Sequence, residues 1–305
     1  MVLSLLPCAS ACAILKLFVT KTAKDGLLLG LIGAGIRTSR TPGMHEREAA
    51  EHGIRCIYKI IDLDELGLAA ASLPELLVAA ERMGFSGLNI THPCKQQIAP
   101  LLTDLSEDAR LLGAVNTVLL RDGKRIGHNT DWWGFAENFR QGLPDAGIER
   151  IVQLGAGGGG AATAYAVLKL GAKQLTIFDL DTERQERLVA ALANSFGENR
   201  VKAGGDLDAA MAQADGLIHA TPTGMNRYPG LPLPEAMLRP DLWIAEIVYL
   251  PIETELLLAA RRIGCRTVDG TGMAVYQAVK AFELFTGLVP DRNRMALHFR
   301  AAGPA

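Results

Sequence analysis

The stretch Ile151-Val152-Gln153-Leu154-Gly155-Ala156-Gly157-Gly158-Gly159-Gly160 decides the fold of this chain. An apolar strand is followed by a glycine turn and then by an alanine-rich helix that runs to about Leu170. Gly155, Gly157 and Gly160 have the GxGxxG spacing, which lets the backbone turn tightly and approach a pyrophosphate at the helix N-terminus. A glycine run can also be a flexible turn, but the strand and helix on either side favour a dinucleotide site.

The residue that ends the next expected strand bears on the choice of dinucleotide. This strand, at 175–178, leads to Asp179, where a carboxylate would bond both hydroxyls of the adenosine ribose. Alternatively, Asp179 and Asp181 only cap the next helix. A 2′-phosphate beside Asp179 would be repelled by roughly 3–4 kcal/mol at ~4–5 Å and an effective dielectric of ~20. The sequence therefore favours NAD over NADP, although Arg184 would soften that preference if it reaches the site.

Short apolar runs alternate with helical segments on both sides of the glycine turn. We expect strands at 27–33, 55–61, 87–90, 217–220 and 243–248, and helices from Pro42, over 73–83, within 96–102 and over 273–286. This alternation predicts parallel βα units, and 305 residues are enough for two modest domains.

Composition excludes several classes of function. The net charge is -2 and no block of basic residues occurs, which argues against a nucleic-acid partner. The five cysteines are scattered without a CxxC pair, and the histidines lack metal-ligand spacing, so we expect neither disulfides nor a metal. The apolar segment Met1–Ala13 lacks a positively charged start and is too short to span a membrane. We interpret 1–25 as an N-terminal extension and expect a cytoplasmic protein.

Four polar stretches resist a purely structural interpretation. They are Ser39-Arg40-Thr41-Pro42, Asn89-Ile90-Thr91-His92-Pro93-Cys94-Lys95, Gly113-Ala114-Val115-Asn116-Thr117 and Gly127-His128-Asn129-Thr130-Asp131. The first could merely cap a helix, or its hydroxyls could hold a carboxylate near the helix N-terminus. The second follows a strand, at the edge where α/β sheets bind ligands.

Together these stretches resemble the shikimate dehydrogenase family. The segments GxxI-x-x-SRTP-x-MH, NIT-x-P-x-K, GAVNT, GHNTD-x-x-GF, GAGG, ATPTGM and DGTGMAVYQAVKAFELFTG match its order and spacing over about 27–295. The substrate loop reads Ser-x-Thr, which is similar to the NAD-dependent quinate/shikimate dehydrogenase branch rather than to the usual Ser-x-Ser. The loop also departs from the commonest pattern, because Gly33 is not followed by Asn-Pro.

The resemblance implies an α/β fold of two domains, and a role for each matched residue. An N-terminal α/β substrate domain would comprise 26–129 and 271–305, and a Rossmann-type NAD-binding domain would comprise 130–270. Catalysis is assigned to Lys95 and Asp131. Substrate contacts are implied at Ser39, Thr41, Asn89, Thr91, Asn116, Tyr249 and Gln277. Cofactor contacts are implied at Gly155, Ala156, Gly157, Gly158, Gly160, Asp179, Arg184, Thr221, Met225, Gly270 and Met273.

The expected reaction is oxidation of a ring hydroxyl of quinate or shikimate, with NAD as the cofactor. Hydride passes to the nicotinamide, and a lysine can take the hydroxyl proton only if its pKa falls toward neutrality. The alternatives are an NADP-dependent biosynthetic shikimate dehydrogenase and, as another class, a non-catalytic quinate/shikimate sensor. An aminated substrate analogue is a weaker possibility. A homodimer is possible.

Overall fold

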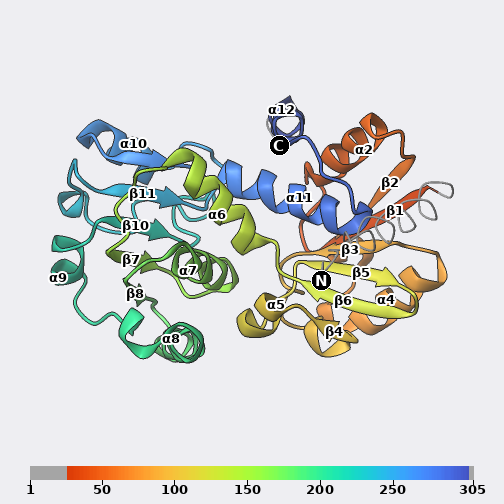
Figure 1. The fold of residues 1–305 in the computed structure, drawn as a ribbon, viewed down its shortest axis with the longest axis horizontal. Coiled ribbons are helices and arrows are strands. Elements are labelled where there is room, and N and C mark those ends of the chain that lie inside the picture. Colours follow the sequence, from red (N-terminus) through yellow and green to blue (C-terminus); the bar gives the residue numbers. More distant parts are fainter. Residues whose placement is uncertain (1–25, 302–305) are drawn as a thin grey trace, which may run out of the picture.

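A computed structural model describes residues 26–301, and the expected extension 1–25 lies outside the described residues. Two six-stranded sheets lie at opposite ends of an elongated molecule, and the long helices α6 (Asp131–Gly142) and α11 (Gly270–Thr286) run between them (Figure 1). The predicted α/β class with two domains is confirmed.

The first sheet is mixed. Its strands are β1 (Leu27–Gly33), β2 (Cys56–Asp62), β3 (Gly87–Ile90), β4 (Asp104–Leu105), β5 (Thr117–Arg121) and β6 (Lys124–His128), in the order β2-β1-β3-β5-β6-β4. Strand β1 is parallel to β2 and β3, whereas β5 is antiparallel to both β3 and β6. The parallel units expected from the strands at 27–33, 55–61 and 87–90 are confirmed, whereas the antiparallel strands β5 and β6 were not predicted.

A tight hairpin accounts for the antiparallel pair. Asp122 and Gly123 form its two-residue turn with positive φ angles of 52° and 73°, the conformation that Asp-Gly favours between strands. The pairing runs from Arg121 opposite Lys124 to Thr117 opposite His128. This register brings the two Asn-Thr clusters of the sequence side by side.

Helices of the first half pack on this sheet and precede its strands. They are α2 (Thr41–Glu51), α3 (Leu63–Leu66), α4 (Leu73–Arg82), α5 (Glu107–Leu112) and the 3-10 turns η1 (Ala70–Ser72) and η2 (Ala99–Leu101). The helix expected within 96–102 was wrong, since only turns and η2 occur there. Pro100 has no N–H to continue an α-helical ladder, which explains the short 3-10 form.

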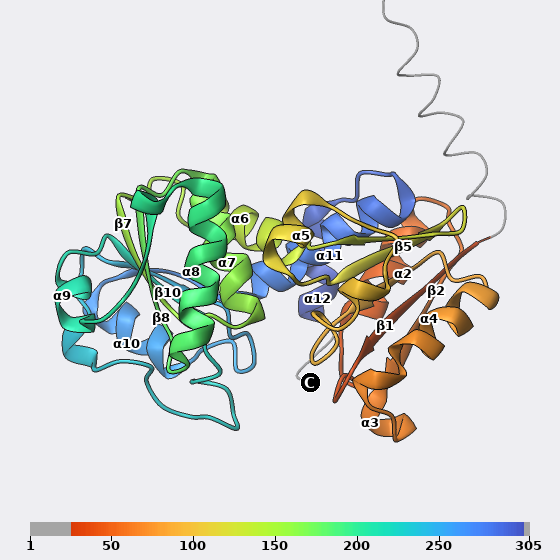
Figure 2. The ribbon, with the colours of Figure 1, turned by 90° about the horizontal axis from the view of Figure 1, so that it is seen from below.

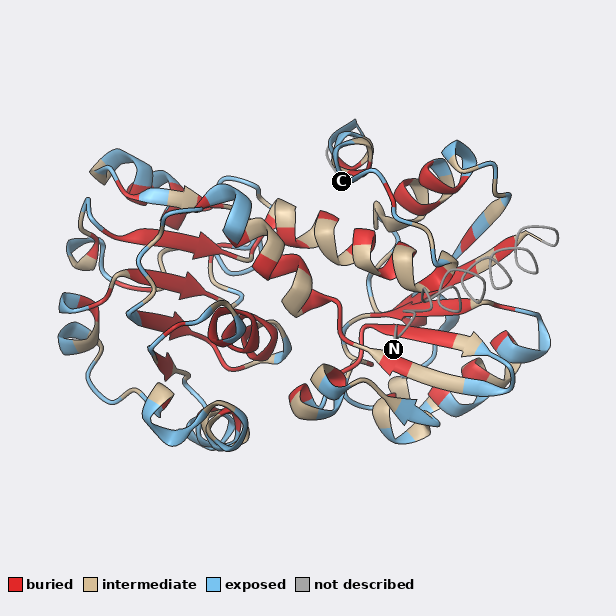
Figure 3. Ribbon diagram, viewed as in Figure 1, coloured by how far each residue is buried: buried red, intermediate tan, exposed pale blue. Residues whose placement is uncertain are grey.

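The second sheet is wholly parallel. Its strands are β7 (Arg150–Leu154), β8 (Gln174–Phe178), β9 (Val201–Ala203), β10 (Gly216–His219), β11 (Trp243–Glu246) and β12 (Arg266–Val268), in the order β12-β11-β10-β7-β8-β9. This is the Rossmann order, in which a dinucleotide binds beyond the carboxyl ends of the strands at the point where the order reverses. Strands β7 and β10 are central and buried (Figure 3).

Helices cover both faces of the second sheet. They are α7 (Gly158–Leu170), α8 (Thr182–Phe196), α9 (Leu207–Ala212), α10 (Glu255–Ile263) and the 3-10 turns η3 (Glu198–Arg200) and η4 (Glu235–Met237). Figure 2 shows α7 and α8 on one face and α9 and α10 on the other, each with its own apolar core.

Helices α6 and α11 pack against each other without room for side chains at two glycines. A Cβ at Gly134 would lie 2.7 Å from the backbone N of Gln277, and one at Gly272 would collide with Asn138. The last helix, α12 (Arg292–Ala301), is tied to α2 by a bidentate ion pair between Arg294 and the buried Glu48. The expected boundaries assign 26–129 with 271–305 to one domain and 130–270 to the other. These boundaries stay a prediction, because α6 and α11 run between the two sheets.

Within residues 26–301, no helix is long and apolar enough to cross a membrane. Within the same range, no three His, Cys, Asp or Glu side chains are grouped so that they could hold a metal ion.

Candidate active site

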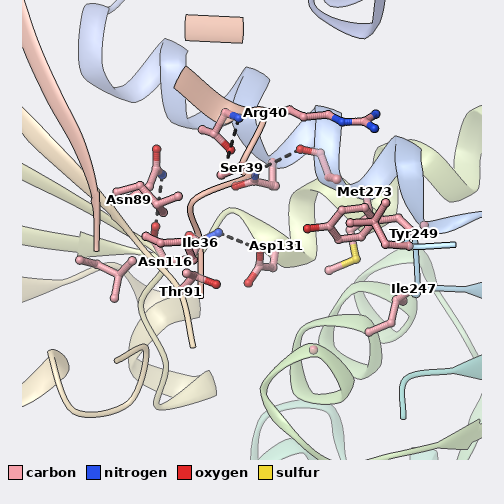
Figure 4. Close-up of a pocket in the computed structure, with 18 of the residues that line it drawn as sticks. Ile36, Ser39, Arg40, Asn89, Thr91, Asn116, Asp131, Ile247, Tyr249 and Met273 are labelled. Carbon is pink, nitrogen blue, oxygen red and sulfur yellow. Dashed lines mark hydrogen bonds between the residues drawn. The ribbon is translucent and has the colours of Figure 1, made fainter. Parts of the chain in front are cut away.

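A cavity of about 380 Å³ lies between the two halves of the molecule. Its polar lining comes mainly from the loops after β1 and β3 and from α6 and α11. These residues are Thr38, Ser39, Arg40, Thr41, Asn89, Thr91, Lys95, Asn116, Asp131, Tyr249 and Gln277. Figure 4 shows Asn89, Asn116 and Thr91 on one side of Asp131, with Tyr249, Met273 and Ile247 on the other. The volume suits a small polar metabolite.

The two expected catalytic residues form an ion pair in this cavity. Lys95 Nζ lies 2.6 Å from Asp131 Oδ2. The lysine side chain is 26% exposed and the aspartate side chain 10%, so the pair is shielded from bulk water but open toward the cavity. Lys95 follows β3, and Asp131 is the first residue of α6, one of the two helices that run between the sheets.

A buried asparagine orients the aspartate. Asn116 Nδ2 donates to Asp131 Oδ1 and to Thr130 Oγ1, both at 2.9 Å. Its Oδ1 accepts from the backbone N–H of Thr130 at 2.7 Å. Both Nδ2 hydrogens are thus engaged within the protein, and the arrangement directs one oxygen of Asp131 to Asn116 and the other to Lys95.

A second buried asparagine, Asn89, is also held by hydrogen bonds within the protein. Tyr58 donates its hydroxyl to Asn89 Oδ1 at 2.8 Å, and Asn89 Nδ2 donates to Thr117 Oγ1 at 3.0 Å and to the carbonyl of Asn116 at 3.2 Å. Burial raises the pKa of Tyr58 well above its ordinary value, so the phenol remains a donor. Asn89 lines the cavity, but most of its hydrogen-bonding capacity serves this network.

The loop that carries Ser39 and Thr41 is organised by a carboxylate at the end of β2. Asp62 accepts hydrogen bonds from the backbone N–H groups of Gly35 at 3.0 Å and Ile36 at 2.8 Å. Burial alone would raise the pKa of Asp62, but these backbone hydrogen bonds outweigh that effect and lower it. Asp62 therefore keeps its charge and fixes the loop.

Ser39 and Thr41 lie at the start of α2 without forming a standard cap. The N-cap position is Arg40, and its side chain makes no capping hydrogen bond. Among residues 26–301, Ser39 Oγ takes part in a single hydrogen bond, a long one of 3.4 Å that it accepts from the backbone N–H of Thr41. Its hydroxyl hydrogen is therefore left to donate into the cavity.

The wall of the cavity that faces Asn89, Thr91 and Asn116 comes from α11 and from the loop after β11. Met273 and Gln277 line the cavity from α11, and Tyr249 lines it from the loop after β11. Burial raises the pKa of Tyr249, while the positive charges of Lys95 and Arg40 oppose that increase. The tyrosine is still 42% exposed, which places it at the rim of the cavity.

The glycine turn separates into two kinds of position. A Cβ at Gly155 would lie 2.5 Å from the carbonyl oxygen of Ala220, and one at Gly160 would lie 2.2 Å from that of Gly155. At Gly157 and Gly158 a Cβ would meet nothing within 4 Å. The first pair allows strand and helix to pack, and the second pair leaves open the side from which a pyrophosphate approaches at the N-terminus of α7. The turn therefore fits a dinucleotide.

The same turn borders the substrate cavity. Gly159 is among the residues that line the cavity, and a Cβ there would lie 2.7 Å from Ile247. The buried Gln153 holds the turn in place by donating to the carbonyls of Gly155 and Gly160, both at 2.8 Å. A dinucleotide that runs along the turn would thus reach the Lys95–Asp131 pair.

The expected ribose ligand is already occupied by protein donors. Asp179 accepts from the backbone N–H of Ala156 at 2.6 Å, from that of Asp181 at 2.9 Å and from Arg184 Nη2 at 2.7 Å. Burial alone would raise the pKa of Asp179, but the hydrogen bonds from Arg184, Asp181 and Ala156 lower it. Asp181 is the residue that caps α8, since its side chain accepts from Arg184 N.

Known proteins match this chain along nearly all of the described range. The family described as Shikimate dehydrogenase substrate binding domain matches residues 31–118, and that described as Shikimate 5'-dehydrogenase C-terminal domain matches 270–296. A Shikimate dehydrogenase (NADP(+)) of Streptomyces avermitilis is 54% identical, over 89% of this chain and 94% of that protein. The chain belongs to the shikimate dehydrogenase family.

Two further relatives carry other names. A Quinate/shikimate dehydrogenase (NAD(+)) of Corynebacterium efficiens is 49% identical, over 90% of this chain and 98% of that protein. The solved structure of a quinate dehydrogenase from Corynebacterium glutamicum in complex with NAD superposes with a TM-score of 0.86 at 48% identity, covering 90% and 99% of the two chains. The resemblance stated from the motifs is therefore confirmed, and this family member is an oxidoreductase that uses a nicotinamide dinucleotide.

The fold of this shikimate dehydrogenase family member gathers most of the expected site residues. The expected substrate residues all line the cavity, together with Lys95, Asp131, Gly270 and Met273. Thr221 and Met225 lie in the loop after β10, outside the cavity lining, and Met225 is 40% exposed. The individual roles of all these residues stay predictions.

Several residues escaped the sequence analysis. Phe299 of α12 lines the cavity, and the Arg40 guanidinium lies 5.0 Å from its ring centre and donates to its carbonyl at 3.1 Å. No sequence signal connects positions this far apart. Asp62 also had no motif of its own, because it acts on backbone groups of the distant loop after β1. Gln153 lies beside the glycine turn, but its role in holding the turn was not predicted.

Proposed function

We propose that the protein catalyses reversible NAD-dependent oxidation of quinate and shikimate to 3-dehydroquinate and 3-dehydroshikimate. The observation that carries this proposal is the Lys95–Asp131 ion pair at 2.6 Å, in a cavity that the glycine turn borders through Gly159. Such a pair next to a dinucleotide site suits proton removal from a hydroxyl whose carbon gives up hydride.

The protein's own task in this reaction is to handle a proton. When bound, the nicotinamide accepts hydride from the ring carbon. The hydroxyl O–H bond breaks as its proton moves to Lys95 Nζ, which accepts it as the neutral amine and becomes an ammonium ion paired with Asp131 Oδ2. Lys95 is the more exposed partner and exchanges that proton with water. Asn116 holds Asp131 in the required orientation throughout.

The substrate carboxylate would be held at the start of α2. Ser39 has a hydroxyl hydrogen to donate, Thr41 lines the same wall, and the helix N-terminus favours an anion. The positive charge of Arg40, the N-cap residue of α2, adds attraction for an acid there. Thr91, Asn116 and Gln277 would face the ring hydroxyls.

NAD is proposed as the preferred cofactor because of the charge of Asp179. Its lowered pKa keeps it ionised, and a ribose 2′-phosphate nearby would meet a like charge. Arg184, 2.7 Å from that carboxylate, weakens the repulsion. We therefore expect a preference for NAD rather than exclusion of NADP. Gly157 and Gly158 would hold the pyrophosphate.

Two observations favour the alternative of an NADP-dependent shikimate dehydrogenase. One is the Arg184–Asp179 ion pair, and the other is the 54% identity to a relative with that name. A non-catalytic sensor would not need the proton-transfer pair, which is intact here.

The proposal also includes a homodimer in the cytoplasm. Light scattering of the purified protein measures its mass and tests the dimer.

Steady-state rates with both substrates and both cofactors test the proposal. The expected result is a higher kcat/KM with NAD than with NADP for both acids, and measurable turnover of quinate. If NADP-linked shikimate oxidation exceeded every NAD-linked rate by tenfold, the biosynthetic alternative would replace it. Tight quinate binding without any turnover would instead support the sensor.

A further inference from the structure

A buried cluster of polar side chains lies at the carboxyl edge of the second sheet, outside the substrate cavity. His219 ends β10 and Glu246 ends β11, and the two residues are directly paired in the parallel register. Both side chains are fully buried, at 0% exposure. Dinucleotides bind beyond this edge of a Rossmann sheet.

The glutamate is held by three donors. His219 Nδ1 lies 2.8 and 3.0 Å from its two carboxylate oxygens. The backbone N–H of Val248 donates to Oε1 at 2.9 Å, and the hydroxyl of Thr254 donates to Oε2 at 3.1 Å. Because a carboxylate only accepts hydrogen bonds, Nδ1 must carry a hydrogen. The imidazole is thus locked in one orientation.

The other ring nitrogen faces a threonine of the loop after β10. His219 Nε2 lies 2.6 Å from Thr221 Oγ1. In the neutral ring with Nδ1 protonated, Nε2 can only accept, so Thr221 donates its hydroxyl hydrogen inward. The oxygen also accepts a longer 3.3 Å hydrogen bond from the backbone N–H of Thr223. One acceptor site of Thr221 remains for a ligand.

Thr221 lies where a cofactor would contact it. Its Cγ2 would be 3.2 Å from a Cβ placed on Gly155, the first glycine of the turn, and the residue is partly exposed, unlike His219 and Glu246. A buried ionisable pair contributes less to stability than well-packed apolar side chains of the same size would. A role in orienting an exposed group explains its presence better than stability does.

We infer that Glu246 and His219 are positioning residues that hold the Thr221 hydroxyl as a hydrogen-bond acceptor for the dinucleotide. This inference rests on the proposed use of a nicotinamide dinucleotide. The donor on the ligand is an O–H of the nicotinamide ribose or an N–H of the carboxamide.

A double-mutant cycle on KM for the dinucleotide tests the inference, with Thr221→Val and His219→Leu made singly and together. Each single change is expected to raise KM for the preferred dinucleotide about three- to tenfold, because each removes one oriented hydrogen bond. The KM for quinate and kcat should change less than twofold. The double variant should resemble Thr221→Val alone, since both changes remove the same interaction. Thr221→Ser should restore a near-normal KM.

Controls separate positioning from a structural role. Thr267→Val removes a hydroxyl from the neighbouring strand β12 and should leave KM unchanged. A lower melting temperature of His219→Leu with an unchanged dinucleotide KM would overturn the inference, as would strictly additive effects. Failure of the wild-type protein to bind either NAD or NADP would instead refute the proposed function.

The source of the ligand donor can be identified with 3-acetylpyridine adenine dinucleotide, which lacks the carboxamide N–H. If the KM effect of Thr221→Val persists with this analogue, the ribose hydroxyl is the donor. If the KM effect disappears with this analogue but persists with the natural dinucleotide, the carboxamide N–H is the donor. The absence of any effect with both dinucleotides contradicts the inference.

Discussion

The two halves of the molecule build their binding surfaces from different parts of the chain. At the carboxyl edge of the second sheet, the glycine turn presents backbone, and the open positions Gly157 and Gly158 have no side chain. In the first half, the cavity presents side chains such as Lys95, whose partner Asp131 is oriented by the buried Asn116. Backbone N–H groups suffice to bind a phosphate, whereas proton transfer needs a titratable group at one defined point.

This difference predicts how each half responds to substitution. Changes in the first half should reduce turnover through lost side-chain chemistry. Changes at the turn should act through steric volume, either on the fold or on the dinucleotide, because there is little side-chain chemistry to lose. Equal losses of turnover, without effects on stability or dinucleotide binding, from changes in both halves would contradict this difference.

The largest effect is expected from Lys95→Ala. Loss of the proton-transfer partner should lower kcat by about 10²–10⁴-fold, while quinate binding remains measurable by calorimetry. Lys124→Ala, at the exposed start of β6, is the matched control and should have normal activity. Unchanged turnover would remove Lys95 from the mechanism.

Asn116→Ala should come next, with kcat reduced by about 100-fold. It leaves both members of the ion pair in place but removes the donor that orients Asp131, and small errors in placement are costly in catalysis. Steady-state kinetics would show the loss mainly in kcat. Asn194→Ala, exposed on α8, serves as a control, and equal effects of the two changes would contradict the assigned orientation.

The glycine turn can be divided by two single substitutions. Gly160→Ala should destabilise the protein by about 1–3 kcal/mol, because its Cβ would meet the Gly155 carbonyl at 2.2 Å. Gly158→Ala should keep the melting temperature and raise the dinucleotide KM by about tenfold through contact with the ligand. The reverse pattern would show that the open positions face no ligand.

Asp62→Asn should lower the melting temperature in a pH-dependent way, because it removes the charge that holds the substrate loop. The folded-state pKa of Asp62 is lowered, so the carboxylate stabilises the fold above its ordinary pKa. This contribution disappears as pH falls through the lowered folded-state value. Melting temperatures should therefore differ between wild type and variant at pH 7, and the difference should shrink as the pH falls below the ordinary aspartate pKa. A gap that widens in acid would contradict the proposed charge state.

The smallest effect is expected from Arg184→Ala. Removing the guanidinium leaves the charge of Asp179 uncompensated, so the preference for NAD over NADP should increase by about two- to fivefold. This preference is measured as kcat/KM with NAD divided by kcat/KM with NADP. Arg187→Ala, one helical turn away and paired with Glu183, is the control. A decrease of the ratio would show that Asp179 does not face the ribose.

Local patterns in the sequence predicted much of the fold but not the shape of the first sheet. Seven of the twelve strands in residues 26–301, and the glycine turn, were found from apolar runs and glycine spacing, whereas β4, β5, β6, β9 and β12 were not. The antiparallel hairpin was missed, although Asp122-Gly123 was a usable turn signal that would have placed Asn116 beside Asn129. The helix expected within 96–102 was wrong because Pro100 interrupts the backbone hydrogen bonds.

By itself, the sequence determined the fold class and the glycine turn, and it predicted which groups do chemistry, because short motifs of neighbouring residues carry these signals. The tertiary structure alone decided which groups meet. It brought Lys95 to Asp131, carried Phe299 to the cavity, placed Asp62 under the substrate loop and paired His219 with Glu246. These contacts join segments far apart in the chain, and only strand register and helix packing determine which distant residues touch.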